Sequence, residues 1–188
     1  LDDRIGGRFL RAGPAYGGSC FPKDTKALVS TGRMFNTNLS VVKSVINSND
    51  KRTNLLLNKI SKIMNNKIKN KNITFLGVTF KPGTDDMRES SSLKMIPALT
   101  RKGAHINYYE PTGKKKELKS KNINFFENIK DACKMADLII IHTEWNEFKQ
   151  LNFKKITNKR NFKVFDMRNL YSSSEMKKNK INYFSIGR

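Results

Sequence analysis

The spacing of apolar residues divides the chain near residue 70. Before that point, two stretches carry apolar side chains at helical spacing. The first begins at Asp24 or Thr25, either of which can cap a helix start. The second extends from about Ser40 to Asn65 with no internal Gly or Pro. Residues 1–22 contain five glycines and two prolines, which predict a loop with tight turns.

After residue 70, short β-branched and aromatic runs alternate with helical patterns. The predicted strands cover residues 73–78, 106–109, 138–142 and 162–165, and the predicted helices cover residues 90–103 and 131–135. The serines at 90–92 offer an N-cap, and Gly103 ends that helix. Strands that alternate with helices predict βαβ units and a parallel sheet, so residues 70–188 are expected to form a doubly wound α/β domain.

The formal charge of +21 raises the alternative of a basic nucleic-acid-binding module. Such a module would group Lys or Arg with aromatic residues on one face. Here the basic residues spread over the whole length, and Lys114–Lys116 is the tight run. The spread favours solvated surface charge over nucleic-acid binding, and a salt-dependent shift assay with unrelated DNA would separate the two.

Two cysteines, Cys20 and Cys133, lie far apart and match no metal-ligand spacing, so no metal site is predicted. The apolar run at 138–141 has the length of a strand, and no run is long enough to span a bilayer. A cytoplasmic, reduced protein without membrane contact is the expectation. Since the first residue is Leu1 within a charged stretch, we expect a piece of a longer protein.

The glycine-rich segment 13–24 contains the strongest candidate for chemistry. A cysteine acts as a nucleophile in its thiolate form, which a helix N-terminus and a nearby cation favour. Cys20 precedes the predicted helix start, with Lys23 close by, and Asp24 could orient a water or accept a proton. The alternative is a small buried cysteine, which we assign to Cys133, beside Ala132 and Ala136 on a predicted helix.

Three segments carry a resemblance to a known family. They are Gly13-Pro14-Ala15-Tyr16-Gly17-Gly18-Ser19-Cys20-Phe21-Pro22-Lys23-Asp24, then residues 75–90 from Phe75 to Ser90, and more weakly residues 136–137 and 143–148 with 166–169. In order and over nearly the whole chain, they resemble the UDP-glucose/GDP-mannose dehydrogenase family. Ala15 stands where the family usually has glycine.

The resemblance implies a fold in three parts: an NAD-binding Rossmann domain, a central helical domain, and a Rossmann-like domain that binds the nucleotide sugar. Residues 1–69 would be the end of the central domain with the cysteine loop, and residues 70–188 the nucleotide-sugar domain. No G-x-G-x-x-G follows a strand, so the NAD-binding domain is expected outside this chain. Family members are usually homodimers or larger homo-oligomers.

The resemblance also implies a reaction. The family oxidises a primary alcohol to a carboxylate with two NAD, through a cysteine thiohemiacetal and a thioester that water hydrolyses. Cys20 would be the nucleophile and Asp24 would position or activate the water, while Lys23 and Arg88 would lie near NAD. The substrate contacts would be Arg4, Arg11, Ala12, Gly13, Pro14, Ala15, Tyr16, Gly17, Phe80, Lys81 and Arg168.

The expected nucleotide sugar depends on single residues in each case. Phe21 resembles the UDP-glucose branch, because the GDP-mannose branch usually has leucine there. Ser19 stands where the UDP-N-acetylmannosamine branch usually has histidine. UDP-glucose oxidation to UDP-glucuronate is therefore the expectation, with the other two nucleotide sugars as alternatives. A further alternative is a nucleotide-sugar-binding fragment without activity, and the chain alone is expected not to reduce NAD.

Overall fold

The computed structural model describes Gly7 and residues 10–187. Its centre is a six-stranded sheet in the order β3-β2-β1-β4-β5-β6, and every neighbouring pair is parallel. The strands are β1 (Asn72–Leu76), β2 (His105–Tyr109), β3 (Ile123–Phe125), β4 (Leu138–Ile141), β5 (Lys163–Asp166) and β6 (Asn182–Ser185). This is the doubly wound α/β order, and it confirms the predicted fold class, a Rossmann-like sheet preceded by helices.

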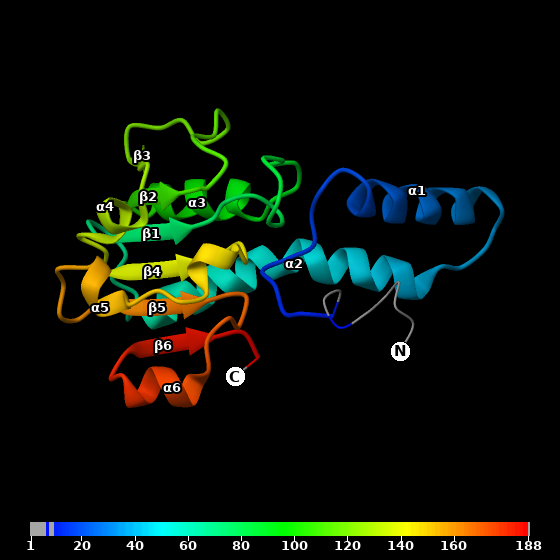
Figure 1. Ribbon diagram of the computed structural model, residues 1–188. Coiled ribbons are helices and arrows are strands. Elements are labelled where there is room, and N and C mark those ends of the chain that lie inside the picture. The colour runs from blue at the N-terminus through cyan, green and yellow to red at the C-terminus, as the bar shows by residue number, and fades with distance from the viewer. Residues whose placement is uncertain (1–6, 8–9, 188) are drawn as a thin grey trace.

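Helices cover both faces of the sheet (Figure 1). The helical elements are α1 (Phe21–Met34), α2 (Ser40–Ile63), α3 (Ser92–Arg101), α4 (Ile129–Cys133), the 3₁₀ turn η1 (Asn146–Phe148), α5 (Phe153–Ile156) and α6 (Ser173–Lys178). The second half of α2 and α3 share one apolar cluster with β1, β2 and β4. Residues of α4, η1, α5 and α6 share the cluster on the other face.

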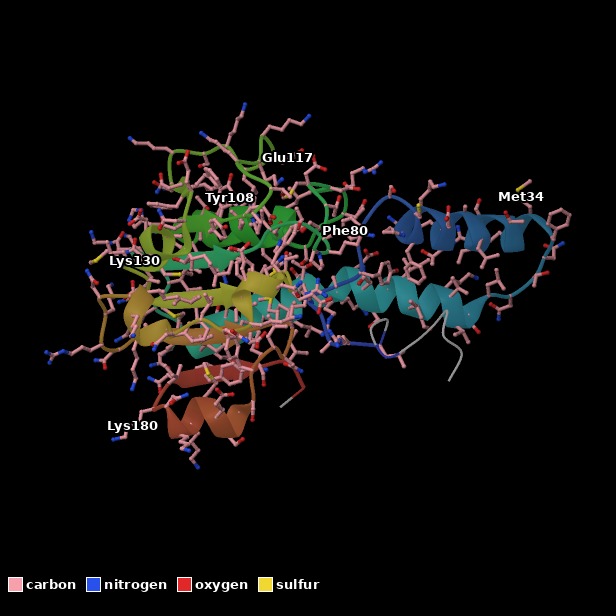
Figure 2. All side chains as sticks on the ribbon, viewed as in Figure 1. Met34, Phe80, Tyr108, Glu117, Lys130 and Lys180 are labelled. Atoms are coloured by element: carbon pink, nitrogen blue, oxygen red, sulfur yellow. The ribbon has the colours of Figure 1, made fainter. Side chains whose placement is uncertain are left out.

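The first part of the chain stands to one side of the sheet (Figure 1). Helix α1 and the first half of α2 form a hairpin there, and only the later part of α2 reaches the sheet. Met34, at the far end of α1, lies well away from the sheet (Figure 2). The division of the chain at residue 69 stays a prediction, since α2 contributes Leu56, Leu57 and Ile60 to the core under the sheet.

The four strands predicted from sequence are present, with ends shifted by one or two residues, and β3 and β6 were missed. Both missed strands are short strands at the edges of the sheet, and their residues are largely half-buried or exposed. An edge strand mixes polar residues into its sequence because one of its sides faces water. The buried central strands read as continuous apolar runs, which made them visible.

The predicted start of the first helix was wrong. Helix α1 begins at Phe21, with Cys20 as its N-cap, and Asp24 lies inside its first turn. Pro22 had been assigned to the loop, but proline is favoured in the first turn of a helix, where its missing N–H costs nothing. The consequence is that Cys20 lies directly at the amino end of α1.

The predicted position of the N-cap serine before α3 is confirmed, but its hydroxyl bonds elsewhere. Ser91 is the N-cap residue, but its hydroxyl makes no capping bond to the helix. Ser91 Oγ instead lies 2.8 Å from His142 Nε2, and Ser90 Oγ donates to the Val78 carbonyl at 2.7 Å. These serines therefore tie the start of α3 to the ends of β1 and β4.

Candidate functional site

The candidate site lies where the carboxyl ends of β1, β4 and β5 meet. Strand order reverses between β1 and β4, and ligands of open α/β sheets bind outside the carboxyl ends at such a point. The long connection 77–91 leaves β1 there and carries Phe80, Lys81 and Arg88. Arg168 follows β5 at the same edge. Figure 2 places Phe80 between the sheet and the helical hairpin.

The glycine-rich loop, residues 10–19, passes over this edge before it enters α1. Gly18 N–H donates to the Arg88 carbonyl at 2.9 Å, and Gly18 has φ +85 with the Phe80 ring against it. A Cβ on Gly17 would lie 2.5 Å from the Glu89 carbonyl oxygen. Both glycines are thus required by the close approach of the loop to the 77–91 connection.

Helix α2 holds the other side of the loop. Asn49 bonds the Tyr16 backbone twice: it accepts from Tyr16 N–H at 3.0 Å and donates to the Tyr16 carbonyl at 3.2 Å. Arg52 donates to the Gly13 carbonyl through Nη2 at 3.0 Å and Nε at 3.3 Å. The loop is therefore fixed between α2 and the 77–91 connection.

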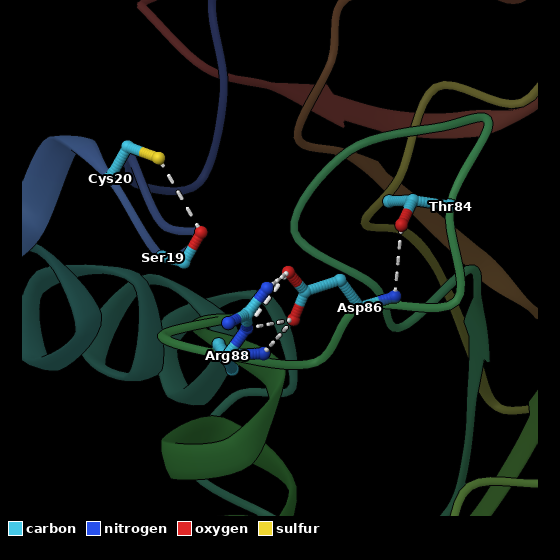
Figure 3. A network of polar contacts seen from close by, with 5 residues as sticks. All are labelled: Ser19, Cys20, Thr84, Asp86 and Arg88. Atoms are coloured by element: carbon cyan, nitrogen blue, oxygen red, sulfur yellow. Dashed lines mark hydrogen bonds and ion pairs between the residues drawn. The ribbon is translucent and has the colours of Figure 1, made fainter.

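Cys20 is exposed at the amino end of α1. Its Sγ lies 3.5 Å from Ser19 Oγ (Figure 3). The Cys20 carbonyl accepts from Asp24 N–H at 2.8 Å. Asp24 follows Cys20 by four residues and so shares its side of the helix. The Asp24 carboxylate pairs with Lys23 at 2.9 Å. That carboxylate, and more weakly Cys20, raises the pKa of Lys23.

Arg88 lies on the sheet side of Cys20 (Figure 3). Its guanidinium makes a two-pronged contact with Asp86, through Nη2 at 2.8 Å and Nε at 3.0 Å. Asp86 raises the pKa of Arg88, with a smaller contribution from Cys20, and the Arg88 partner lowers the pKa of Asp86. A second fixed cation therefore stands within electrostatic reach of the thiol.

Arg168 is far less exposed than a solvated surface charge would be. Its Nε donates to the His142 carbonyl at 2.9 Å and its Nη2 to the Phe80 carbonyl at 3.1 Å. A Cβ on Gly13 would lie 2.8 Å from its Nη1. Burial lowers the pKa of Arg168, and Glu144 and Asp166 oppose that shift. Arg168 thus joins β4, the 77–91 connection and the glycine-rich loop.

The structure brings most of the predicted site residues to one edge of the molecule. Lys81 is exposed, with Nζ 5.4 Å from the centre of the Phe80 ring. Tyr16 stacks edge-on against Phe21 at 4.7 Å, and Arg11 is exposed. Pro14 is buried, and Ala12 and Ala15 are half-buried. Arg4 lies outside the described residues.

Sequence reasoning missed the residues that support this site. Asn49 and Arg52 sit within a helical pattern, where polar residues look like a solvated face. Glu110 follows β2 and is 1% exposed. Its Oε2 accepts from Val78 N–H at 2.7 Å and its Oε1 from Thr112 Oγ1 at 3.1 Å. A polar residue directly after a buried strand was the available signal for Glu110.

Among Gly7 and residues 10–187, no group of three or more His, Cys, Asp and Glu side chains could hold a metal ion. No described helix combines the length and the hydrophobicity needed to cross a bilayer.

Comparison with known proteins gives two family matches. The UDP binding domain of the UDP-glucose/GDP-mannose dehydrogenase family matches residues 74–173, and the central domain of the same family matches residues 1–51. Curated relatives include the UDP-glucose 6-dehydrogenases of Rickettsia felis and Rhizobium meliloti. Each is 40% identical over all of this chain, which spans 43% and 44% of their lengths.

Solved structures agree with the fold. A UDP-glucose dehydrogenase from the archaeon Pyrobaculum islandicum is 25% identical, with a TM-score of 0.80 over 100% of this chain and 41% of that one. The GDP-mannose dehydrogenase of Pseudomonas aeruginosa has a TM-score of 0.75 at 19% identity, over 98% of this chain and 42% of that one. The chain belongs to the UDP-glucose/GDP-mannose dehydrogenase family.

Proposed function

We propose that this chain is the nucleotide-sugar-binding and cysteine-bearing part of an NAD-dependent UDP-glucose 6-dehydrogenase. The observation that carries the proposal is the position of Cys20. It is an exposed thiol at the amino end of α1, on a glycine-rich loop packed against the carboxyl edge of a parallel sheet. That edge is where a nucleotide would bind, so the Cys20 thiol would lie next to the bound ligand.

The proposed role of Cys20 is to capture an aldehyde. Its thiolate adds to the carbonyl carbon of the aldehyde made in the first oxidation, and the resulting thiohemiacetal can lose a second hydride to become a thioester. Water then cleaves the carbon–sulfur bond, which gives the carboxylate and regenerates the thiol. The cations Lys23 and Arg88 lie near the Cys20 thiol, and Asp24, on the Cys20 side of α1, would orient that water.

The sheet of this chain does not fit NAD. In dinucleotide-binding sheets, an acidic residue about 20 residues beyond the glycine-rich turn binds a ribose hydroxyl. The acidic residue at the end of β2, Glu110, is buried, and both of its oxygens accept bonds from the chain itself. We therefore propose that NAD, which accepts hydride when bound, is held by another part of the protein. Lys23 and Arg88 are the residues of this chain proposed to approach it.

The proposed sugar contacts follow the arrangement at the sheet edge. Residues 11–17 would enclose the nucleotide sugar from one side, and Phe80 with Lys81 would meet it from the other. For Arg168, two guanidinium nitrogens are occupied by carbonyls, which leaves Nη1, on the Gly13 side, for a ligand. Arg4 is proposed as a further contact.

We also propose a homo-oligomer in the cytoplasm. The hairpin exposes large apolar side chains, among them Met34 at 77%, Val41 at 75% and Phe35 at 74%. Such side chains are typical of an interface, and a second copy of the chain is the proposed partner. Light scattering of the parent chain and of Val41→Glu tests the proposed homo-oligomer. A parent chain that is already monomeric would refute the proposal.

Titration calorimetry with UDP-glucose, GDP-mannose and UDP-N-acetylmannosamine tests the substrate. We expect binding of UDP-glucose alone. Preference for either of the other two sugars would reassign the branch, and absence of all binding would mean that another part of the protein helps to build the sugar site. The chain by itself should not reduce NAD, and any turnover by it would contradict the missing cofactor site.

The two cysteines give a matched test of mechanism in the longer protein. Cys20→Ala should abolish formation of UDP-glucuronate. Cys133→Ala, a change at a thiol that is 0% exposed on α4, should leave the reaction in place. Product formation by the Cys20→Ala protein at the parent rate would rule out covalent capture.

A further inference from the structure

The conformation of the glycine-rich loop depends on two residues outside it. Asn49 and Arg52 lie three residues apart on α2 and therefore on one side of that helix. Each makes two hydrogen bonds to loop backbone, Asn49 at Tyr16 and Arg52 at the Gly13 carbonyl, at distances of 3.0 to 3.3 Å. Both side chains are half-buried.

Backbone–backbone hydrogen bonds contribute little to the shape of this loop. Within the described part of the chain, residues 10–19 make one backbone–backbone hydrogen bond, from Gly18 N–H to the Arg88 carbonyl. Its glycines restrict the backbone weakly, since glycine has the largest conformational freedom of any residue. A loop of this composition keeps one conformation only where side chains from elsewhere satisfy its N–H and C=O groups.

The geometry of the two contacts is specific. The Asn49 amide pairs with the N–H and C=O of one residue, as a neighbouring strand would, and this fixes the plane of Tyr16. Arg52 directs two donors to one carbonyl, which fixes Gly13. Tyr16 itself packs on Phe21, and Gly13 itself lies against Arg168.

We propose that Asn49 and Arg52 are positioning residues. They hold residues 13–18 in the conformation that forms one wall of the sugar site and delivers Cys20 to the edge of the sheet. The nucleotide sugar as ligand rests on the proposed function, whereas the conformational role rests only on the hydrogen bonds of Asn49 and Arg52 to the loop. Neither residue touches the reacting atoms.

Hydrogen–deuterium exchange of the 188-residue chain tests the proposal. Loss of a hydrogen bond raises local opening by roughly two- to tenfold. In Asn49→Ala, where Tyr16 N–H loses its acceptor, we expect peptides within 13–18 to exchange roughly two- to tenfold faster. In Arg52→Ala we expect faster exchange of the same peptides through opening of the loop, and peptides of β1 and β4 should keep their rates in both variants. The matched control is Asn58→Ala, an exposed residue nine positions beyond Asn49 and on the opposite side of α2, which should exchange as the parent chain does.

Alkylation of Cys133 reports unfolding in the same samples, because that thiol is 0% exposed in the folded chain. Where Cys133 stays protected, parent-like exchange at 13–18 in Asn49→Ala overturns the proposal. If an Ala variant is alkylated at Cys133, the conservative variants Asn49→Asp and Arg52→Lys test the proposal in its place. Asn49→Asp keeps the acceptor for Tyr16 N–H and loses the donor, so a rate between parent and Ala is expected, and parent-like rates in both overturn the proposal.

Calorimetry with UDP-glucose distinguishes the conformational role of Asn49 and Arg52 from the proposed binding of the nucleotide sugar. Faster exchange at 13–18 together with at least tenfold weaker UDP-glucose binding supports the whole proposal. Faster exchange in the variants, together with a parent chain that binds no UDP-glucose, supports the conformational role and removes UDP-glucose as a ligand of this chain by itself. Faster exchange with undiminished UDP-glucose affinity overturns the claim that the loop conformation forms the sugar site.

Discussion

Lowering the pH from 7 to 5 should destabilise this chain through His142. That imidazole is 0% exposed at the carboxyl end of β4. Its Nε2 lies 2.8 Å from Ser91 Oγ and its Nδ1 lies 3.2 Å from Thr143 Oγ1. Burial, with a smaller contribution from the Arg168 cation, lowers the pKa of His142 to about 3. The imidazole is therefore neutral in the folded chain.

The direction of this pH effect follows from the difference between the pKa of His142 in the unfolded chain and in the folded chain. The unfolded chain takes up a proton at His142 near pH 6.5, and the folded chain does so only near 3. The contribution to stability is complete above pH 6.5 and is lost progressively as the pH falls toward 3. Since each pKa unit corresponds to 1.36 kcal/mol, the change from pH 7 to pH 5 should cost about 2 kcal/mol.

Urea unfolding at both pH values measures this loss. The variant His142→Gln keeps a polar group near Ser91 and cannot be protonated, so its loss between pH 7 and pH 5 should be smaller by about 2 kcal/mol. His105, exposed at the start of β2, provides the control, and His105→Gln should retain the parent loss. Equal losses in the parent chain and in His142→Gln would refute the reasoning.

Two further predictions concern packing and hydrogen bonding. Gly17→Ala places a Cβ 2.5 Å from the Glu89 carbonyl oxygen. It should cost about 1–3 kcal/mol in urea unfolding, whereas Gly7→Ala, with nothing within 4 Å, should cost little; equal costs would show that the loop yields freely. Asp137→Ala removes the acceptor of Asn72 N–H at 2.9 Å and of Lys159 Nζ at 2.6 Å. It should cost about 1–3 kcal/mol, against no measurable change for the exposed Asp85→Ala, and a silent Asp137→Ala would contradict the geometry.

The position of the sheet followed from sequence because its central strands are buried on both faces. All four residues of β4 are buried, and four of the five residues of β1 are. Such strands must be apolar along their whole length, so their pattern is visible without knowledge of the neighbours. Strands β3 and β6 face water on one side, and their mixed sequences carried no comparable signal.

The candidate nucleophile was also visible in the sequence, because glycines, a cysteine and a Lys-Asp pair stand together in twelve consecutive positions. The catalytic assignment of Cys20 and Asp24 remains a prediction. The helix start was predicted too late because Pro22 was taken as a loop residue. In the structure Pro22 lies in the first turn of α1, where proline is favoured.

The class of fold, the order of the central elements and the position of the cysteine loop could all be predicted from the chain alone. Each of these depends on neighbours along the chain. The distant side chains that support the loop were identified only from contacts in the folded chain. Asn49 reaches Tyr16 across 33 positions, Arg52 reaches Gly13 across 39, and Arg168 reaches Phe80 across 88. The role of a polar side chain depends on the partner that folding brings to it, and no local periodicity encodes that partner.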